Sequence, residues 1–213
     1  MIENDKDNYK VDEQNRIYII GGKGVGKTTF LYQIQSGKFQ SDLSPSKRGI
    51  IKSTYKYGNK EFTLKDFTDD DNFTTTNILK NELEEALLIF VLLSVDDPKS
   101  FEYAKTLIQF IKNNLINNKE LNIILLGNKC DLYEENKDDR KVGKREIDQY
   151  IRNIDNLYYY DISCKNNFNI DTIRKLINDI EIEEEKDEDD DKMPEEERKE
   201  KAKNAKEKSC IIY

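Results

Sequence analysis

Apolar residues gather in short runs along this chain, separated by polar and charged stretches. Residues 87–93 (LLIFVLL) and 122–126 (NIILL) are examples, and their length and β-branched content favour buried strands. Neither run approaches the ~20 apolar residues that a membrane span requires. Strands are predicted over residues 16–21, 50–57, 60–65, 87–95, 122–127 and 157–163.

Amphipathic runs lie between most of these strands and predict helices over residues 27–35, 98–116, 143–153 and 170–180. The last of them places five apolar residues on one helical face: Ile170, Ile173, Leu176, Ile177 and Ile180. Repeated strand–helix alternation favours an α/β fold with a doubly wound, mostly parallel sheet of six strands. Gly58-Asn59 is a two-residue hairpin signal, so one arm of the sheet is predicted to be antiparallel.

Composition and charge divide the 213 residues into three parts. Residues 1–15 are polar and mixed in charge, which predicts a flexible extension without a secretory signal. Residues 16–183 hold the alternating pattern and are predicted to form one domain. Residues 181–200 contain 13 acids against 4 bases, and the tail from 184 to 213 has the composition of a disordered segment. Three cysteines fit a reducing compartment, and the lack of histidine excludes imidazole chemistry.

A phosphate-binding loop is predicted directly after the first strand. Residues 21–28 (GGKGVGKT) match the pattern G-x-x-x-x-G-K-[ST], in the strand-to-helix context that the pattern requires. Glycines let backbone N–H groups curl around phosphate oxygens, and the helix N-terminus adds favourable partial charge. Lys27 would reach the β- and γ-phosphates, and the Thr28 hydroxyl would ligate Mg²⁺.

A second motif indicates which base is recognised. Residues 128–131 (NKCD) follow a strand and match the N-K-x-D signature of guanine-binding proteins. The Asp131 carboxylate can accept from both the ring N–H and the exocyclic amine of guanine, whereas adenine offers no such donor pair. Residues 163–165 (SCK) follow the next strand, where a backbone N–H could meet the guanine carbonyl; an ordinary strand-end turn is the alternative.

With these motifs in this order, the chain resembles the Ras superfamily of small GTPases over residues 14–183. The resemblance implies a P-loop NTPase fold of the small G-domain type, bound GTP or GDP, and Mg²⁺ held by Thr28, Ser46 and Asp66. It also places Phe39 across the edge of the guanine. The implied nucleotide-binding residues are Gly21, Lys23, Gly24, Val25, Gly26, Lys27, Thr28, Thr29, Phe39, Ser46, Asn128, Lys129, Asp131, Ser163, Cys164 and Lys165. Ser46 could instead be a simple polar loop residue.

The second switch departs from the family pattern D-x-x-G, which is often followed by a glutamine that orients water. Asp66 matches the first position, but Asp69 stands for the glycine and Asp70 for the glutamine. Besides Lys27, Asp70 is the only catalytic candidate, and it is a poor replacement. Slow hydrolysis is therefore predicted, although this acidic stretch could also be a solvated loop without a role. Lys23 could screen phosphate charge, but we favour that it obstructs an activating protein.

The chain ends in Cys210-Ile-Ile-Tyr213, which matches the prenylation pattern of a cysteine and two aliphatic residues. Four lysines precede it and could assist one lipid chain at an anionic surface: Lys201, Lys203, Lys206 and Lys208. A cytoplasmic protein on the cytoplasmic face of a membrane is predicted. Tyr213 is an unusual last residue, which leaves the lipid open.

The resemblance implies a guanine-nucleotide switch that meets effector and regulatory proteins. Residues 47–49 (KRG) give the first switch a basic sequence, so an acidic partner is a hypothesis and an exposed basic loop its alternative. No nucleic-acid partner is expected. The alternative function is a pseudo-GTPase that acts as an interaction module, locked to nucleotide or free of it. A third possibility, a P-loop ATPase, is opposed by Asn128, Lys129 and Asp131.

Overall fold

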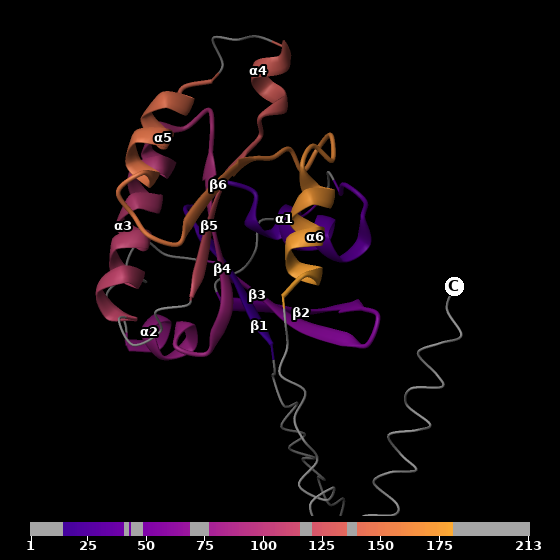
Figure 1. Cartoon of the computed structure of the whole chain (residues 1–213). Coiled ribbons are helices and arrows are strands. Elements are labelled where there is room, and N and C mark those ends of the chain that lie inside the picture. Colours follow the sequence, from indigo (N-terminus) through magenta and orange to yellow (C-terminus); the bar gives the residue numbers. More distant parts are fainter. Residues whose placement is uncertain are drawn as a thin grey trace, which may run out of the picture. The chain divides into compact units, whose positions relative to one another are not determined.

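The computed structural model describes residues 15–40, 43, 49–68, 77–115, 121–135 and 140–180. In these residues a six-stranded sheet runs through the centre of the domain (Figure 1). Its order is β2-β3-β1-β4-β5-β6, with β2 antiparallel to β3 and the other neighbouring pairs parallel. The strands are β1 (Arg16–Gly21), β2 (Gly49–Tyr57), β3 (Lys60–Thr68), β4 (Ala86–Ser94), β5 (Asn122–Asn128) and β6 (Leu157–Asp161). The predicted fold class is confirmed.

Helices cover both faces of the sheet. They are α1 (Lys27–Ser36), α2 (Asn77–Leu83), α3 (Pro98–Asn114), α4 (Asp131–Glu135), α5 (Lys144–Ile151) and α6 (Ile170–Asn178). Figure 1 shows α1 and α6 on one face and α2, α3 and α5 on the other. The two shortest helices, α2 and α4, were not predicted from the sequence.

Local sequence explains where the main helices begin and end. α1 lies between Gly26 and Gly37, whose φ angles of 95° and 73° are in the left-handed region that favours glycine. α3 begins with Pro98 at its first position, and the Asp97 carboxylate accepts from the Lys99 N–H at 3.0 Å. At the predicted hairpin, Tyr57 pairs with Lys60 and Gly58 takes a φ of 59°. These caps fix the loops that follow the strands.

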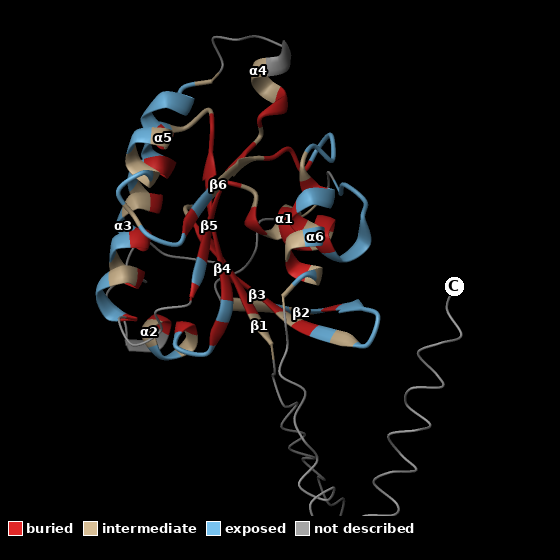
Figure 2. Ribbon diagram, viewed as in Figure 1, coloured by how far each residue is buried: buried red, intermediate tan, exposed pale blue. Residues whose placement is uncertain are grey.

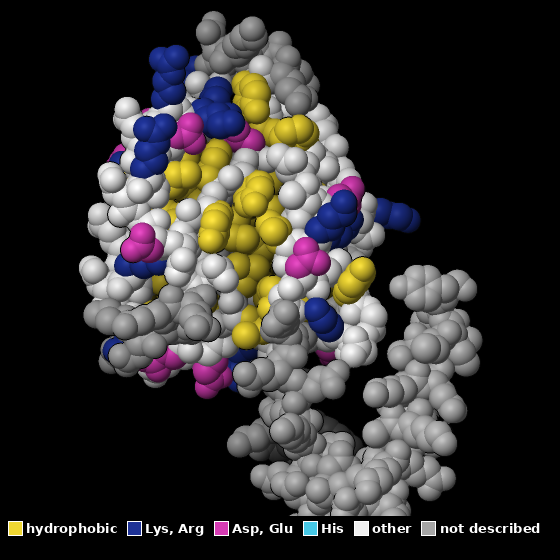
Figure 3. Space-filling model, in the orientation of Figure 1, with side chains coloured by type: hydrophobic (Ala, Val, Ile, Leu, Met, Phe, Trp, Pro, Cys, Tyr) yellow, Lys and Arg dark blue, Asp and Glu magenta, His cyan; other side chains and the backbone are white. Residues whose placement is uncertain are grey.

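The core is double because the sheet is covered on both faces. Eight of the nine residues of β4 are buried, as expected for a central strand that packs against helices on either side. Figure 2 shows the buried residues concentrated along the strands and the inner sides of the helices. β6 lies at the edge of the sheet, and Figure 3 shows apolar side chains along this part of the surface, where Tyr158 is 50% exposed.

Candidate functional site

The predicted site residues meet at the carboxyl ends of the parallel strands, where open α/β sheets bind ligands. Loops that follow β1, β5 and β6 line one pocket of about 260 Å³. Nine of its ten lining residues were predicted from the sequence, and Leu132 was not. The lining residues are Gly24, Gly26, Thr29, Phe39, Asn128, Lys129, Asp131, Leu132, Cys164 and Lys165.

The loop after β1 requires glycine at two positions. A Cβ on Gly21 would lie 2.3 Å from the Leu92 carbonyl oxygen, and one on Gly26 would lie 2.4 Å from Nδ2 of Asn128. Both residues also have a positive φ, 149° and 95°. The loop is therefore drawn tightly against β4 and β5, and its backbone curls as a phosphate-binding loop requires. Val25, within the loop, is buried.

Lys27 spans this loop from the first turn of α1. Its ammonium donates to the carbonyl oxygens of Gly21 at 2.9 Å and Gly22 at 2.8 Å. The side chain is almost wholly buried. Its positive charge, the loop N–H groups and the N-terminus of α1 together make this end of the pocket suitable for anions. Lys23, on the same loop, is exposed.

Thr28 and Asp66 come together beside the loop. The Thr28 hydroxyl donates to Oδ2 of Asp66 at 2.6 Å. Asp66 is 0% exposed, and its Oδ1 has no hydrogen-bond partner among the described residues. Burial raises the pKa of Asp66, while the Thr28 hydrogen bond and the Lys27 charge lower it. A buried carboxylate oxygen without a partner, next to a hydroxyl, suits a small divalent cation with oxygen ligands.

Asn128 joins the phosphate loop to the other end of the pocket. Its Nδ2 donates to the Val25 carbonyl at 2.9 Å, and its Oδ1 accepts from the Cys164 N–H at 3.3 Å. The side chain is buried. Lys129 follows with a φ of 66°, a backbone conformation that side-chain-bearing residues seldom adopt. One amide thus sets the spacing between the loops after β1, β5 and β6.

Asp131 is held by the loop that follows β6. Its Oδ1 accepts from the Ser163 hydroxyl at 2.6 Å, and its Oδ2 lies 3.8 Å from the Lys165 ammonium. Ser163 Oγ also accepts from the Asn166 N–H at 3.0 Å. Residues 128–131 and 163–165 therefore lie together as one unit. Phe39 lies at the rim of the same pocket and is 43% exposed.

Cys164 is an inert part of this unit. Burial raises the pKa of its thiol to about 12, with the nearby Asp131 also raising it and the Asn128 hydrogen bond lowering it. Cys130 is buried as well, and neither cysteine forms a disulfide with another described residue. A thiol that stays protonated at neutral pH is a poor nucleophile, so Cys164 serves as a small packing group.

A supporting cluster behind the pocket was missed in the sequence. Arg140 donates to both carboxylate oxygens of Asp161, at 3.0 and 3.1 Å, and to the Tyr159 hydroxyl at 3.2 Å. It also lies 5.0 Å from the ring centre of Tyr133 in α4. This arginine links α4, which begins at Asp131, to the end of β6. Its spacing along the chain gave no signal.

Several residues with predicted roles lie outside the described part of the chain: Ser46, Lys47, Arg48, Asp69, Asp70, Lys201, Lys203, Lys206, Lys208 and Cys210. Their roles stay predictions. The same holds for the three predicted parts of the chain, because residues 1–14 and 181–213 are not described. Within the described ranges, the helices are too short or too polar to cross a membrane.

Comparison with known proteins gives a family match over most of the chain. The model of the Ras family matches residues 16–181. The chain is 23% identical to the GTP-binding protein Rhes of Homo sapiens over 73% of its own length, and it covers 60% of that relative's length. It is 27% identical to the Ras-related protein Rab-10 of Diplobatis ommata, covering 73% of this chain and 75% of the relative. It is 29% identical to GTPase RhebL1 of Mus musculus, covering 61% and 70%.

Proposed function

Because the chain belongs to the Ras family of small GTPases, we propose that it is a guanine-nucleotide switch that binds GDP and GTP with Mg²⁺ and hydrolyses GTP slowly. The observation that carries this proposal is the joining of two ends of one pocket. Lys27 and the glycine loop form a site for anions. Asp131 and the loop after β6 form a site that can accept hydrogen bonds from a base. Asn128 holds the two sites at a fixed spacing.

At the base end, the Asp131 carboxylate would accept from the guanine ring N–H and exocyclic amine. Ser163 already orients this carboxylate through a 2.6 Å hydrogen bond, so little rotational freedom is lost on binding. Lys165 would move from its 3.8 Å approach to Asp131 and cover the base with its side-chain stem. Phe39, at the rim, would cover the edge of the base.

At the phosphate end, Lys27 would exchange two carbonyl acceptors for phosphate oxygens, and Thr28 and Asp66 would hold Mg²⁺. The cation would neutralise charge on the phosphates. Its arrival would provide the partner that Oδ1 of Asp66 lacks among the described residues and would favour the ionised carboxylate. Ser46 is proposed as a further ligand of the same ion.

Slow hydrolysis follows from the acidic second switch. A carboxylate at ~5 Å from a phosphate charge costs about 3 kcal/mol at an effective dielectric of ~20. Asp69 and Asp70 replace the glycine and glutamine positions of the family pattern, so they oppose closure on the γ-phosphate instead of orienting water. The same departure favours the second candidate function, a pseudo-GTPase that keeps its nucleotide and acts as an interaction module.

A single-turnover experiment separates the two functions. Protein is purified, its bound nucleotide is released by denaturation and identified, and GTP hydrolysis is followed over hours with Mg²⁺. Bound GDP with slow turnover supports the switch, and persistent GTP or an empty site supports the module. Wild-type hydrolysis as fast as that of ordinary family members would contradict the role given to the two aspartates.

Variants test the acidic loop directly. Asp69→Gly with Asp70→Gln restores the family pattern and is expected to speed hydrolysis by about tenfold or more, because it removes charge repulsion worth a few kcal/mol. Asp71→Asn is the matched control, since it removes a neighbouring charge at a position outside the pattern. An equal gain in the control would attribute the effect to net charge alone.

Membrane attachment through Cys210 completes the proposal. The terminal C-I-I-Y sequence matches the prenylation pattern, and the preceding lysines would attract an anionic leaflet on the cytoplasmic side. Cys210→Ser should move the protein from the membrane to the supernatant fraction, whereas Ser209→Ala, the control, should not. A Cys210→Ser variant that still sediments with membranes would remove this route.

A further inference from the structure

Two buried polar side chains, Lys65 and Tyr18, meet a partly exposed carboxylate, that of Glu82, at the edge of the apolar core under α2. Lys65 of β3 is 1% exposed and Tyr18 of β1 is 0% exposed, yet both contact Glu82 of α2. Apolar residues of the main core cluster surround them, among them Phe67, Leu79 and Leu83. Lysine is one of the residue types least often fully buried, and it is buried chiefly when it is paired.

The two donors converge on a single oxygen. The Lys65 ammonium donates to Oε2 of Glu82 at 2.9 Å, and the Tyr18 hydroxyl donates to the same atom at 3.1 Å. The ammonium also lies 5.5 Å from the centre of the Tyr18 ring. Burial raises the pKa of Tyr18 and the Glu82 charge raises it further, so the hydroxyl remains a donor. Each of the three side chains therefore contacts the other two.

Such a cluster adds little to stability but strongly restricts where the helix can lie on the sheet. Replacing a buried ion pair with apolar residues of similar volume is often neutral, whereas removing one partner leaves an uncompensated charge. Apolar contacts such as those of Leu79 and Leu83 tolerate sliding of a helix on a sheet. A hydrogen-bonded ion pair tolerates it far less, because a shift would take the carboxylate away from an ammonium that is almost wholly buried.

We propose that Lys65, Glu82 and Tyr18 form a charged clamp that fixes the position of α2 on the sheet. Lys65 directly precedes Asp66, so the clamp spans the second switch from the residue before it to the helix after it. All three are positioning residues. If the switch function proposed above is correct, the clamp keeps α2 in place when the nucleotide changes.

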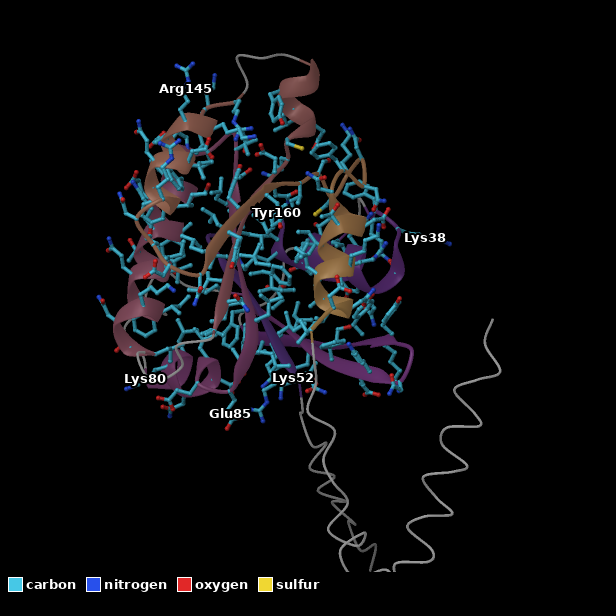
Figure 4. The ribbon with its side chains drawn as sticks, viewed as in Figure 1. Lys38, Lys52, Lys80, Glu85, Arg145 and Tyr160 are labelled. Carbon is cyan, nitrogen blue, oxygen red and sulfur yellow. The ribbon has the colours of Figure 1, made fainter. Side chains whose placement is uncertain are left out.

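Hydrogen exchange measured by mass spectrometry tests the clamp. The main variant is Tyr18→Phe with Lys65→Met and Glu82→Leu, which removes the hydroxyl, the ammonium and the carboxylate together, so that none of the three is left without the other two. Glu84→Gln is the matched control, because Glu84 directly follows the last residue of α2 but is exposed, with its carboxylate 3.9 Å from the Lys80 ammonium. Figure 4 labels Lys80 and Glu85, which mark this region of the surface.

The triple variant is expected to unfold cooperatively within about 5 °C of the wild-type midpoint. Its backbone amides over residues 77–83 should nevertheless exchange about tenfold faster or more, while those of α1 and the control variant stay unchanged. Exchange over 77–83 as slow as in the wild type would overturn the clamp, since packing alone would then position α2. Should the triple variant fail to fold, Glu82→Gln is judged by the same criterion.

Hydrogen exchange in the two nucleotide states tests whether α2 keeps its place. In the wild-type protein, exchange over residues 77–83 should differ less than about twofold between the GDP form and the form with a non-hydrolysable GTP analogue. A difference of about tenfold would show that α2 moves with the nucleotide, which would overturn the claim that the clamp keeps it in place. The comparison of variants needs no nucleotide, so failure of the clamp and failure of the switch function are distinguishable.

Discussion

Replacing Asn128 with alanine is expected to weaken both ends of the pocket at once. The side chain makes two buried hydrogen bonds, from its Nδ2 to the Val25 carbonyl at 2.9 Å and from the Cys164 N–H to its Oδ1 at 3.3 Å. Each backbone group left without a partner in a buried position costs about 1–3 kcal/mol. Two such groups would together cost about 2–6 kcal/mol. Because the 3.3 Å hydrogen bond is the weaker of the two, we expect the free energy of unfolding to fall by about 2–5 kcal/mol.

Urea denaturation followed by far-UV circular dichroism, with and without GDP, measures this loss. Asn122→Ala is the matched control, because Asn122 begins the same strand but is exposed, and it should change stability by less than about 0.5 kcal/mol. Affinity for GDP should fall as well, since the loops around the phosphates and the base lose their common link. An Asn128→Ala protein as stable as the control variant would refute the idea that this amide sets the loop spacing.

Three further predictions concern single residues of the site. Gly26→Ala should lose GDP binding while Gly143→Ala keeps it, because an added Cβ meets Asn128 at 2.4 Å in the first case and open space in the second; calorimetry checks both. Asp66→Asn should abolish the gain in GDP affinity that Mg²⁺ provides, which titrations with and without EDTA measure. It should not lower the stability of the metal-free protein, because it removes a buried charge whose Oδ1 lacks a partner among the described residues. Cys164 should resist iodoacetamide at pH 8 in the folded protein and react once it is unfolded, as read by peptide mapping. Because folding raises its thiol pKa from 9.0 to about 12, the unfolded state loses this proton first, so stability should fall between pH 9 and 12, and less so in Cys164→Ala.

The sequence predicts the sheet well because its strands are continuous apolar runs bounded by clear turn residues. Gly58 supplies the positive φ that the hairpin needs, and Gly26 supplies the one before α1. The loop motifs were informative for the same reason. A glycine pattern indicates where the backbone must turn tightly, and a carboxylate at a strand end indicates a group that can contact a ligand. Residues that act within one loop can be found from one stretch of sequence.

Contacts between distant segments could not be predicted in this way. α2 has only seven residues, and in the pattern its Glu82 is an ordinary polar position of a short helix. Its pairing with Lys65, 17 residues earlier, exists only once the helix lies on β3. Arg140 precedes α5 and Asp161 ends β6, 21 residues later, and the two pair only in the folded domain. Such pairs depend on the packing of elements, which local pattern does not encode.

Guanine recognition by Asp131 is tested most directly by calorimetry of nucleotide-stripped protein with GDP and with ADP. Two hydrogen bonds to a charged carboxylate, at about 1.5–3 kcal/mol each, predict that GDP binds about 100-fold tighter than ADP or more. Asp131→Ala should remove that preference and leave phosphate-dependent binding through Lys27. Equal affinity for GDP and ADP in the wild-type protein would contradict the account.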